Sequence, residues 1–281
     1  MKFLITGAKG QLGIEFVKLF TRFEADFVAF SREELDVSKL EEVLAAMEEF
    51  KPDVVVNCAA YNLVDQAETE SFEAFKVNAL GARNIAFACK KYGAFLVHYS
   101  TDYVFDGTKM GLYTEEDTPN PINEYGKSKY FGENLIKEVT DEYLILRTSW
   151  VYGEGTQNFI YKVLTWVEKQ DVLRIVCDEY SVPTSAFVIV EITLKALREG
   201  LIGTYHLVNT GYASRYEWAK EILALKGIPK FIYPACQDDF NLPAKRPRFS
   251  AMSNEKISTL LNAEIPHWKD ELKRFILSSS V

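Results

Sequence analysis

The sequence has little of what metal centres and disulfide frameworks are built from. Its 281 residues include only four cysteines and three histidines. No two cysteines stand in a C-x-x-C pair and the histidines are far apart, which disfavours a metal cluster, and a chain of this length does not suggest a disulfide framework. We therefore expect no bound metal ion, and the cysteine usage fits a reducing compartment.

The sequence also lacks a long apolar run and a basic cluster. No stretch reaches the roughly 18 apolar residues of a membrane-spanning helix, and the apolar run near the N-terminus is too short for a signal peptide. The formal net charge is −8 and no long basic run is present, which disfavours nucleic acid as a partner. With 48% hydrophobic residues, we expect a folded cytoplasmic protein that binds neither membrane nor nucleic acid.

Short apolar segments alternate with longer segments of helical periodicity in the first half of the chain. The apolar segments, expected as strands, are residues 2–6, 27–31, 53–60, 95–100 and 143–148. Strands that alternate with helices predict right-handed βαβ units and a parallel sheet, and almost wholly apolar strands predict cover on both faces. A capping box of Ser38 and Glu41 is expected at the start of the second helix. The expected fold class is α/β, with a Rossmann-type doubly wound parallel sheet.

The second half of the chain is less regular. Residues 158–169 and 184–200 have helical patterns, and residues 172–178 and 204–209 have strand patterns. We expect residues 1–150 to form a dinucleotide-binding Rossmann domain. Residues 151–281 are expected to form mainly a smaller α/β substrate-binding lobe, interleaved with the first domain.

A glycine-rich turn follows the first expected strand. Gly7, Gly10 and Gly13 stand in a G-x-x-G-x-x-G pattern. Such a turn lets the backbone approach a pyrophosphate, which the N-terminus of the following helix also attracts. Gly13 would let that helix pack closely on the strand. The alternative is an ordinary βα turn that is rich in glycine.

The end of the second expected strand bears on the choice of cofactor. An acidic residue there binds the ribose hydroxyls of NAD, whereas an arginine accommodates the 2′-phosphate of NADP. The sequence has Ser31 and Arg32 at this place, which favours NADPH over NADH. Glu33 and Glu34 follow directly and can neutralise Arg32, so NADH stays open as the alternative.

The segment "NEYGKSKYFGE" sets Tyr125 four residues before Lys129. On a helix these side chains lie on one face, and an adjacent ammonium lowers the pKa of a phenol from about 10. Such a tyrosine can exchange a proton with a carbonyl–alcohol pair near neutral pH. Ser100 and Thr101 end the fourth expected strand, where ligands of α/β sheets bind. The alternative is a surface pair that occurs by chance.

Several motifs occur together in one order along the chain. They are the glycine loop, "NCAAY", "VNALGARN", "YSTDYVFDG", "PINEYGKSK" and "RTSWVYG". In this combination the chain resembles the extended short-chain dehydrogenase/reductases, and most of all the dTDP-4-dehydrorhamnose reductase family, over nearly its whole length. The resemblance implies an NAD(P)H-dependent oxidoreductase that reduces the C4 keto group of dTDP-4-dehydro-6-deoxy-L-mannose to give dTDP-L-rhamnose.

The resemblance also implies roles for single residues. Tyr125 would donate the proton, Lys129 would lower the pKa of Tyr125 and hold the nicotinamide ribose, and Thr101 would complete the catalytic triad. Together with the glycine loop, the implied cofactor-binding residues are Gly7, Gly10, Gln11, Leu12, Gly13, Ser31, Arg32, Asp36, Val37, Ala59, Ala60, Tyr61, Asn62, Asn78, Tyr125 and Lys129. The implied substrate-binding residues are Thr101, Asp102, Tyr103, Trp150 and Arg246.

Three of these residues have plain structural alternatives. Trp150 can be core packing after a strand, Asn78 can be a structural amide that bends its helix, and Arg246 can belong to a structural salt bridge rather than bind a diphosphate. The sequence also departs from the family, because Glu179 and Ser181 replace the usual glutamine and glycine in "DEYSVPT". The segment "RPRFSAM" departs as well. These departures leave the exact sugar nucleotide open.

Two other functions compete with the reductase. One is a nucleotide-sugar epimerase or dehydratase of the same superfamily, and the other is a non-catalytic regulatory subunit that binds NADP. The intact set of Thr101, Tyr125 and Lys129 favours an enzyme. The oligomeric state stays open, with a homodimer as one alternative.

Overall fold

A six-stranded parallel sheet forms the centre of the molecule, and the computed structural model describes residues 1–278 of the chain. All of its neighbouring strands run parallel. In spatial order the strands are β2 (Phe27–Phe30), β1 (Phe3–Thr6), β3 (Val54–Asn57), β4 (Phe95–Thr101), β5 (Tyr143–Thr148) and β10 (Gly203–His206).

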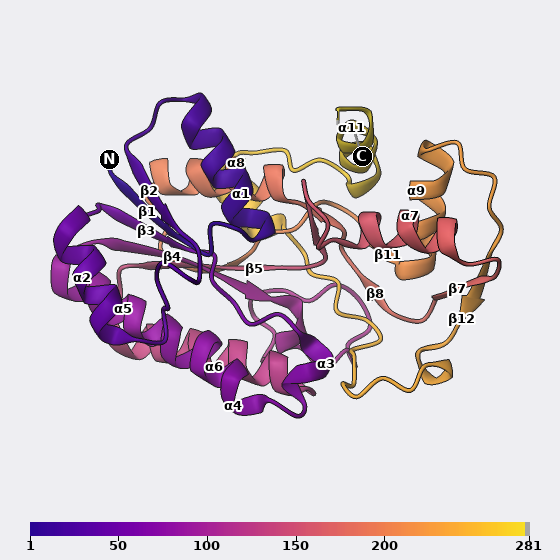
Figure 1. Cartoon of the computed structure of the whole chain (residues 1–281), viewed down its shortest axis with the longest axis horizontal. Coiled ribbons are helices and arrows are strands. Elements are labelled where there is room, and N and C mark those ends of the chain that lie inside the picture. The colour runs from indigo at the N-terminus through magenta and orange to yellow at the C-terminus, as the bar shows by residue number, and fades with distance from the viewer. Residues whose placement is uncertain (279–281) are drawn as a thin grey trace.

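Helices cover both faces of this sheet (Figure 1). Helices α1 (Gln11–Arg22) and α8 (Ala186–Arg198) pack together on one face. Helices α2 (Leu40–Phe50), α5 (Ala82–Tyr92) and α6 (Glu124–Val139) cover the other.

Successive strand residues point to opposite faces of the sheet and join different apolar clusters. Ile5 and Val56 join the cluster under α1 and α8, whereas Leu4 and Val55 join the cluster under α2 and α5. This follows from the two-residue period of a strand. The expected Rossmann-type, doubly wound sheet is confirmed.

The strand order reverses direction beside β1. The chain runs from β1 to β2 on one side and then crosses to β3 on the other side of β1. Crossovers that leave in opposite directions open a crevice at the carboxyl ends of these strands, which is where α/β sheets bind ligands. The glycine-rich turn follows β1 and therefore lies at this switch point.

The helical segment from Ser71 to Tyr92 contains a wide turn. Helix α4 (Ser71–Phe75) continues into a π-helical turn (Lys76–Gly81) and then into α5. Asn78 lies within the wide turn, in keeping with an amide that bends its helix. Helix α5 is followed by Gly93 as its C-cap, with a φ of +72° that favours glycine.

The predicted capping box at the second helix is wrong. Helix α2 begins at Leu40 and its N-cap is Lys39, with no side-chain cap. The Ser38 hydroxyl donates instead to the Asp36 carboxylate at 2.7 Å. The Asp36 carboxylate therefore competes with the hydrogen bond that a capping box requires of the Ser38 hydroxyl.

The remaining elements form a second, smaller core beside the carboxyl edge of the sheet (Figure 1). Its helices are α7 (Phe159–Lys169), α9 (Arg215–Leu225) and α11 (Trp268–Ser278). Three short strand pairs complete it: β7 (Leu173–Val176) with β12 (Ile232–Ala235), β8 (Tyr180–Ser181) with β11 (Ala213–Ser214), and β6 (Val151–Tyr152) with β9 (Thr184–Ser185).

Two elements from the second half of the chain belong to the main sheet and its covering helices. Strand β10 joins the sheet, and α8 packs on α1. The other helices are α3 (Val64–Ala67) and α10 (Glu255–Leu260), with short 3₁₀ turns at Asp102–Val104 and Gln237–Asp239. Between residues 1 and 278, no helix combines the length and the apolar character that crossing a bilayer requires.

Candidate active site

A cleft of about 770 Å³ runs along the carboxyl edge of the sheet, between the two cores. Its size is typical of a pocket for a small molecule or cofactor. Most of the predicted site residues line it: Gly7, Gly10, Gln11, Leu12, Arg32, Asp36, Val37, Ala59, Ala60, Tyr61, Asn62, Thr101, Asp102, Tyr103, Tyr125, Lys129, Trp150 and Arg246. The fold thus brings together residues from almost the full length of the chain.

The glycine loop packs with no room for side chains. A Cβ atom on Gly13 would lie 2.3 Å from the Gly7 carbonyl oxygen. Gly7 itself has a φ of +68°, which favours glycine. Gly10 is the N-cap of α1 and has no capping side chain. The first N–H groups of this helix lack intrahelical partners and face the cleft, so the loop fits a pyrophosphate.

The acidic residues beside Arg32 are occupied elsewhere. The Glu33 carboxylate pairs with Lys9 at 3.1 Å, and the Glu34 carboxylate accepts the backbone N–H of Ser31 at 2.8 Å. Hydrogen bonds from Ser31 and Lys9 lower the pKa of Glu33 to about 2. Within the described part of the chain, Arg32 takes part in no ion pair, so Glu33 and Glu34 do not neutralise it through a direct contact.

Tyr125 lies in the first turn of α6, close to the end of β4. The Asn123 side chain caps this helix by accepting the Gly126 N–H at 2.8 Å. A Cβ atom on Gly126 would lie 2.2 Å from the Tyr103 carbonyl oxygen, so this glycine allows the helix start to approach the strand end. Burial raises the pKa of Tyr125 to about 12, and a hydrogen bond with Thr101 opposes that rise. Tyr125 is therefore a protonated phenol at neutral pH.

The Lys129 side chain makes its polar contacts with strand β4. Its ammonium donates to the Tyr99 carbonyl oxygen at 2.5 Å and lies 3.5 Å from His98 Nε2. Burial lowers the pKa of Lys129 to about 8. The groups that shift the pKa of Tyr125 are Thr101 and Asp102, not Lys129. The effect of Lys129 on the pKa of Tyr125 stays a prediction, and in this structure a backbone acceptor holds the ammonium.

A buried ion pair fixes α6 against the sheet. Arg147 of β5 donates from Nε and Nη2 to the two carboxylate oxygens of Glu133, at 2.9 and 2.7 Å. Both side chains are nearly inaccessible, with 4% and 0% exposed. Two parallel hydrogen bonds of this kind define direction as well as distance. The pair thus holds the helix that carries Tyr125 and Lys129.

Three predicted cofactor-binding residues do not line the cleft. Gly13 packs against the backbone of Gly7 and Ala8 beneath the glycine loop. Ser31 is buried, and its N–H is used by Glu34. Asn78 is buried and bonds the backbone N–H and C=O of Tyr61 and the Ser128 hydroxyl at 2.8–2.9 Å. This matches the structural alternative, since Asn78 ties the β3 loop to α6.

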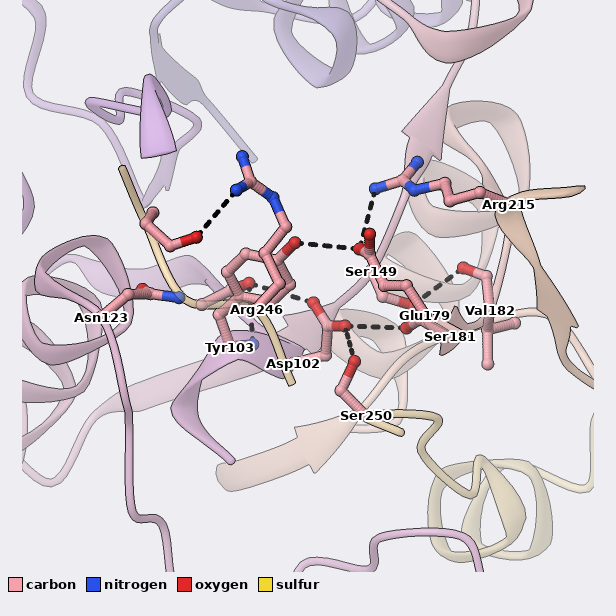
Figure 2. Close-up of polar contacts among 12 residues, drawn as sticks. Asp102, Tyr103, Asn123, Ser149, Glu179, Ser181, Val182, Arg215, Arg246 and Ser250 are labelled. Carbon is pink, nitrogen blue, oxygen red and sulfur yellow. Dashed lines mark hydrogen bonds and ion pairs between the residues drawn. The ribbon is translucent and has the colours of Figure 1, made fainter. Parts of the chain in front are cut away.

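Asp102 and Tyr103 meet the second core through residues that the sequence did not single out as ligands (Figure 2). Asp102 accepts the hydroxyls of Ser181 and Ser250 at 2.7 and 2.6 Å. Burial raises the pKa of Asp102 to about 6. The Tyr103 hydroxyl donates to Glu179 at 3.1 Å. The residues that depart from the family pattern, Glu179 and Ser181, therefore make polar contacts with Tyr103 and Asp102.

Trp150 and Arg246 match their structural alternatives while also lining the cleft. The Trp150 ring stacks on Trp218, with centroids 5.6 Å apart, and its backbone φ is +41°. Arg246 makes a two-pronged salt bridge to Asp65, at 2.7 and 3.0 Å. No local pattern links Arg246 to Asp65, because 181 residues separate them.

The chain is similar to known proteins over nearly its whole length. A family model described as RmlD substrate binding domain matches residues 1–280. The chain is 36% identical over 286 residues to a dTDP-4-dehydrorhamnose reductase from Burkholderia thailandensis, with 96% of each chain covered. This chain belongs to the dTDP-4-dehydrorhamnose reductase family.

Solved structures of this reductase family share the fold over its full extent. A dTDP-4-dehydrorhamnose reductase from Clostridium acetobutylicum has a TM-score of 0.95 at 39% identity, with 98% of each chain covered. A reductase from Bacillus anthracis, solved in complex with NADP, has a TM-score of 0.95 at 36% identity, with 99% of this chain and 100% of that chain covered. The predicted family is thus confirmed.

Within residues 1–278, no three or more His, Cys, Asp or Glu side chains are grouped so as to hold a metal ion. All four cysteines are free thiols.

Proposed function

We propose that this chain reduces the C4 keto group of dTDP-4-dehydro-6-deoxy-L-mannose with NAD(P)H and so forms dTDP-L-rhamnose. One observation carries the proposal. In this member of the reductase family, Thr101, Tyr125 and Lys129 line the same cleft as the glycine loop. A cofactor held by the loop and a sugar held by the second core would meet at these three residues.

The chain's own residues supply the proton and the geometry. A bound reduced nicotinamide supplies the hydride. Tyr125 keeps its proton at neutral pH and can give it to the oxygen that forms on the sugar. Thr101 lines the cleft beside that phenol, and its hydroxyl opposes the rise in the pKa of Tyr125. Lys129 carries a positive charge below about pH 8 and lines the same cleft.

The cleft has the features expected of a dinucleotide site. The glycine loop and the start of α1 would hold the pyrophosphate. Lys9 and Arg32 both line the adenosine end of the cleft. Because Arg32 is free of its acidic neighbours, we propose NADPH as the preferred cofactor and NADH as the alternative.

The competing functions have less support. A regulatory subunit needs no proton donor, yet Thr101, Tyr125 and Lys129 all line the cleft. An epimerase or dehydratase of the same superfamily would use a similar cleft, and only its products distinguish it. We also propose a dinucleotide-binding part at residues 1–150, a mainly substrate-binding part at residues 151–281, and a cytoplasmic location, which the free thiols support.

The direct test is turnover with the named substrate. The protein is mixed with dTDP-4-dehydro-6-deoxy-L-mannose and NADPH or NADH, and oxidation is followed at the nicotinamide absorbance band. We expect stoichiometric oxidation, faster with NADPH, and dTDP-L-rhamnose as the product by mass spectrometry and NMR. No oxidation with either cofactor would refute the proposed function.

A further inference from the structure

Arg215 occupies a distinctive place on the substrate side of the cleft. It is the first residue of α9, and its guanidinium carbon lies 3.7 Å from the centroid of the Trp150 ring. Trp150 is in turn stacked on Trp218. A guanidinium stacked on an aromatic face is held in one plane while its N–H donors at the edge stay available.

Most of the donors of Arg215 are uncommitted. Its one ionic partner among the described residues is Glu179, at 3.5 Å, which is beyond an ideal charged hydrogen bond. Glu179 is itself shared, because it accepts the Tyr103 hydroxyl at 3.1 Å. The Arg215 side chain is 22% exposed and lines the cleft (Figure 2). The site thus presents a partly buried, pre-oriented cation.

The other cations on this side are paired with carboxylates or exposed to solvent. Arg246 donates to Asp65 and to the Ala244 carbonyl oxygen. Arg174 pairs with Asp239 at 2.6 Å. Lys162 lines the cleft but is exposed, so it adds a flexible point charge without a fixed direction. Arg215 is therefore the side chain best able to bind a fixed anion here.

The position of Arg215 relative to Tyr125 suggests which anion it binds. The rings of Tyr125 and Tyr103 are in edge contact with centroids 5.9 Å apart, and Tyr103 bonds Glu179, the partner of Arg215. Arg215 thus lies a few side chains along the cleft from the proton donor. In a hexose whose C4 reacts at Tyr125, the substituent on C1 lies across the ring. In a nucleotide sugar that substituent is the diphosphate.

We propose that Arg215 binds the diphosphate of the nucleotide-sugar substrate, a role that rests on the function proposed above. Trp150 supplies the platform, and Glu179 restrains the guanidinium from the side. Arg246, which the sequence favoured for this role, instead links the C-terminal segment to α3 through Asp65. A guanidinium fork matches two phosphate oxygens, so the site selects nucleoside diphosphates over nucleosides.

Calorimetric titration of full-length protein with dTDP and with thymidine tests this role. For Arg215→Met we expect dTDP to bind about 10-fold to 100-fold more weakly, the range of lost hydrogen bonds to a charged group. Thymidine and NADPH should bind as in the wild type. In turnover, the KM for the sugar nucleotide should rise while the KM for NADPH stays constant. Arg22→Met, at the far end of α1, is the matched control and should change none of these values.

The outcomes separate the two proposals. Unchanged dTDP binding in Arg215→Met, or an equal loss for thymidine, would overturn the role of Arg215 while the reductase activity stands. If the methionine variant does not fold, Arg215→Lys keeps the charge and much of the packing. It should still lose several-fold in dTDP binding alone, and no loss would overturn the role. Wild-type protein that binds no dTDP and oxidises no cofactor would overturn the proposed function itself.

Discussion

Replacing Arg147 by methionine should destabilise the protein through the carboxylate that it leaves behind. Glu133 is 0% exposed and accepts two hydrogen bonds from Arg147. Methionine fills much of the same space but donates nothing. The nearest remaining cation is Lys137, 3.8 Å from Glu133 and partly exposed. The variant therefore has a buried carboxylate whose charge is poorly compensated.

The magnitude follows from the burial of the pair. Removing one partner of a buried ion pair costs about 3–5 kcal/mol, and Lys137 places this case near the lower limit. We expect a loss of about 3 kcal/mol, equivalent to a fall in Tm of about 6–10 °C for a chain of this size. Lys127→Met, on the same helix, removes an exposed pair with Glu124 and should cost below about 0.5 kcal/mol.

The pH dependence gives a second, independent readout. Burial by itself raises the pKa of Glu133, but Arg147 more than offsets this, so in the wild type the pKa lies below its usual value. A lowered pKa stabilises the fold above the unfolded pKa and loses that effect as the pH falls. In Arg147→Met burial dominates and the pKa is raised, so stability is greatest at low pH and falls as the pH rises through the new pKa.

Urea unfolding followed by circular dichroism at pH 5.5 and pH 8 measures both effects. The penalty for Arg147→Met should be larger at pH 8 than at pH 5.5. The double variant Arg147→Met with Glu133→Leu should recover much of the loss, because neither charge then remains buried. A single-variant loss below about 1 kcal/mol, or a penalty that does not change with pH, would refute this account of the ion pair.

Three further predictions concern catalysis and cofactor binding. Tyr125→Phe should lower kcat by about 100-fold or more while NADPH affinity, measured by fluorescence titration, stays near the wild-type value; unchanged turnover would remove Tyr125 as proton donor. The rate should fall as the pH rises past about 8, because Lys129, which would hold the nicotinamide ribose, then loses its charge; a kcat/KM profile that is flat to pH 10 would contradict this. Gly13→Ala should weaken NADPH binding more than Gly10→Ala, because the new methyl group lies 2.3 Å from the Gly7 carbonyl in the first case and 3.3 Å in the second; equal effects would show that loop packing does not control the site.

The strands and most site residues could be predicted because their signals are local. The predicted apolar segments became β1 to β5 of the sheet, and β1 and β3 are buried along their whole length, since a strand covered on both faces must be apolar throughout. The glycine spacing identified the turn after β1, and the spacing of Tyr125 and Lys129 identified α6. The capping box at Ser38 was wrong because Asp36 competes for the hydroxyl.

Other site features were beyond prediction because they depend on distant partners. Arg246 pairs with Asp65, which lies 181 residues away in the sequence. Lys129 donates to the Tyr99 carbonyl oxygen. Arg215 gave no signal as an arginine at a helix start, and it became a candidate ligand only once it lay over Trp150. Glu179 and Ser181 were visible as departures from the family pattern, but their contacts with Tyr103 and Asp102 were not.

The sequence by itself determined the doubly wound sheet, the phosphate-binding turn and the tyrosine at the strand end, because each depends on residue type and near-neighbour spacing. The tertiary structure decided which charges are free to act. Lys129, Arg246 and Arg215 are all cations of the same cleft, and a sequence cannot rank them. Their partners come from separate elements that meet only in the folded chain, and an ion pair depends on distance in space rather than along the chain.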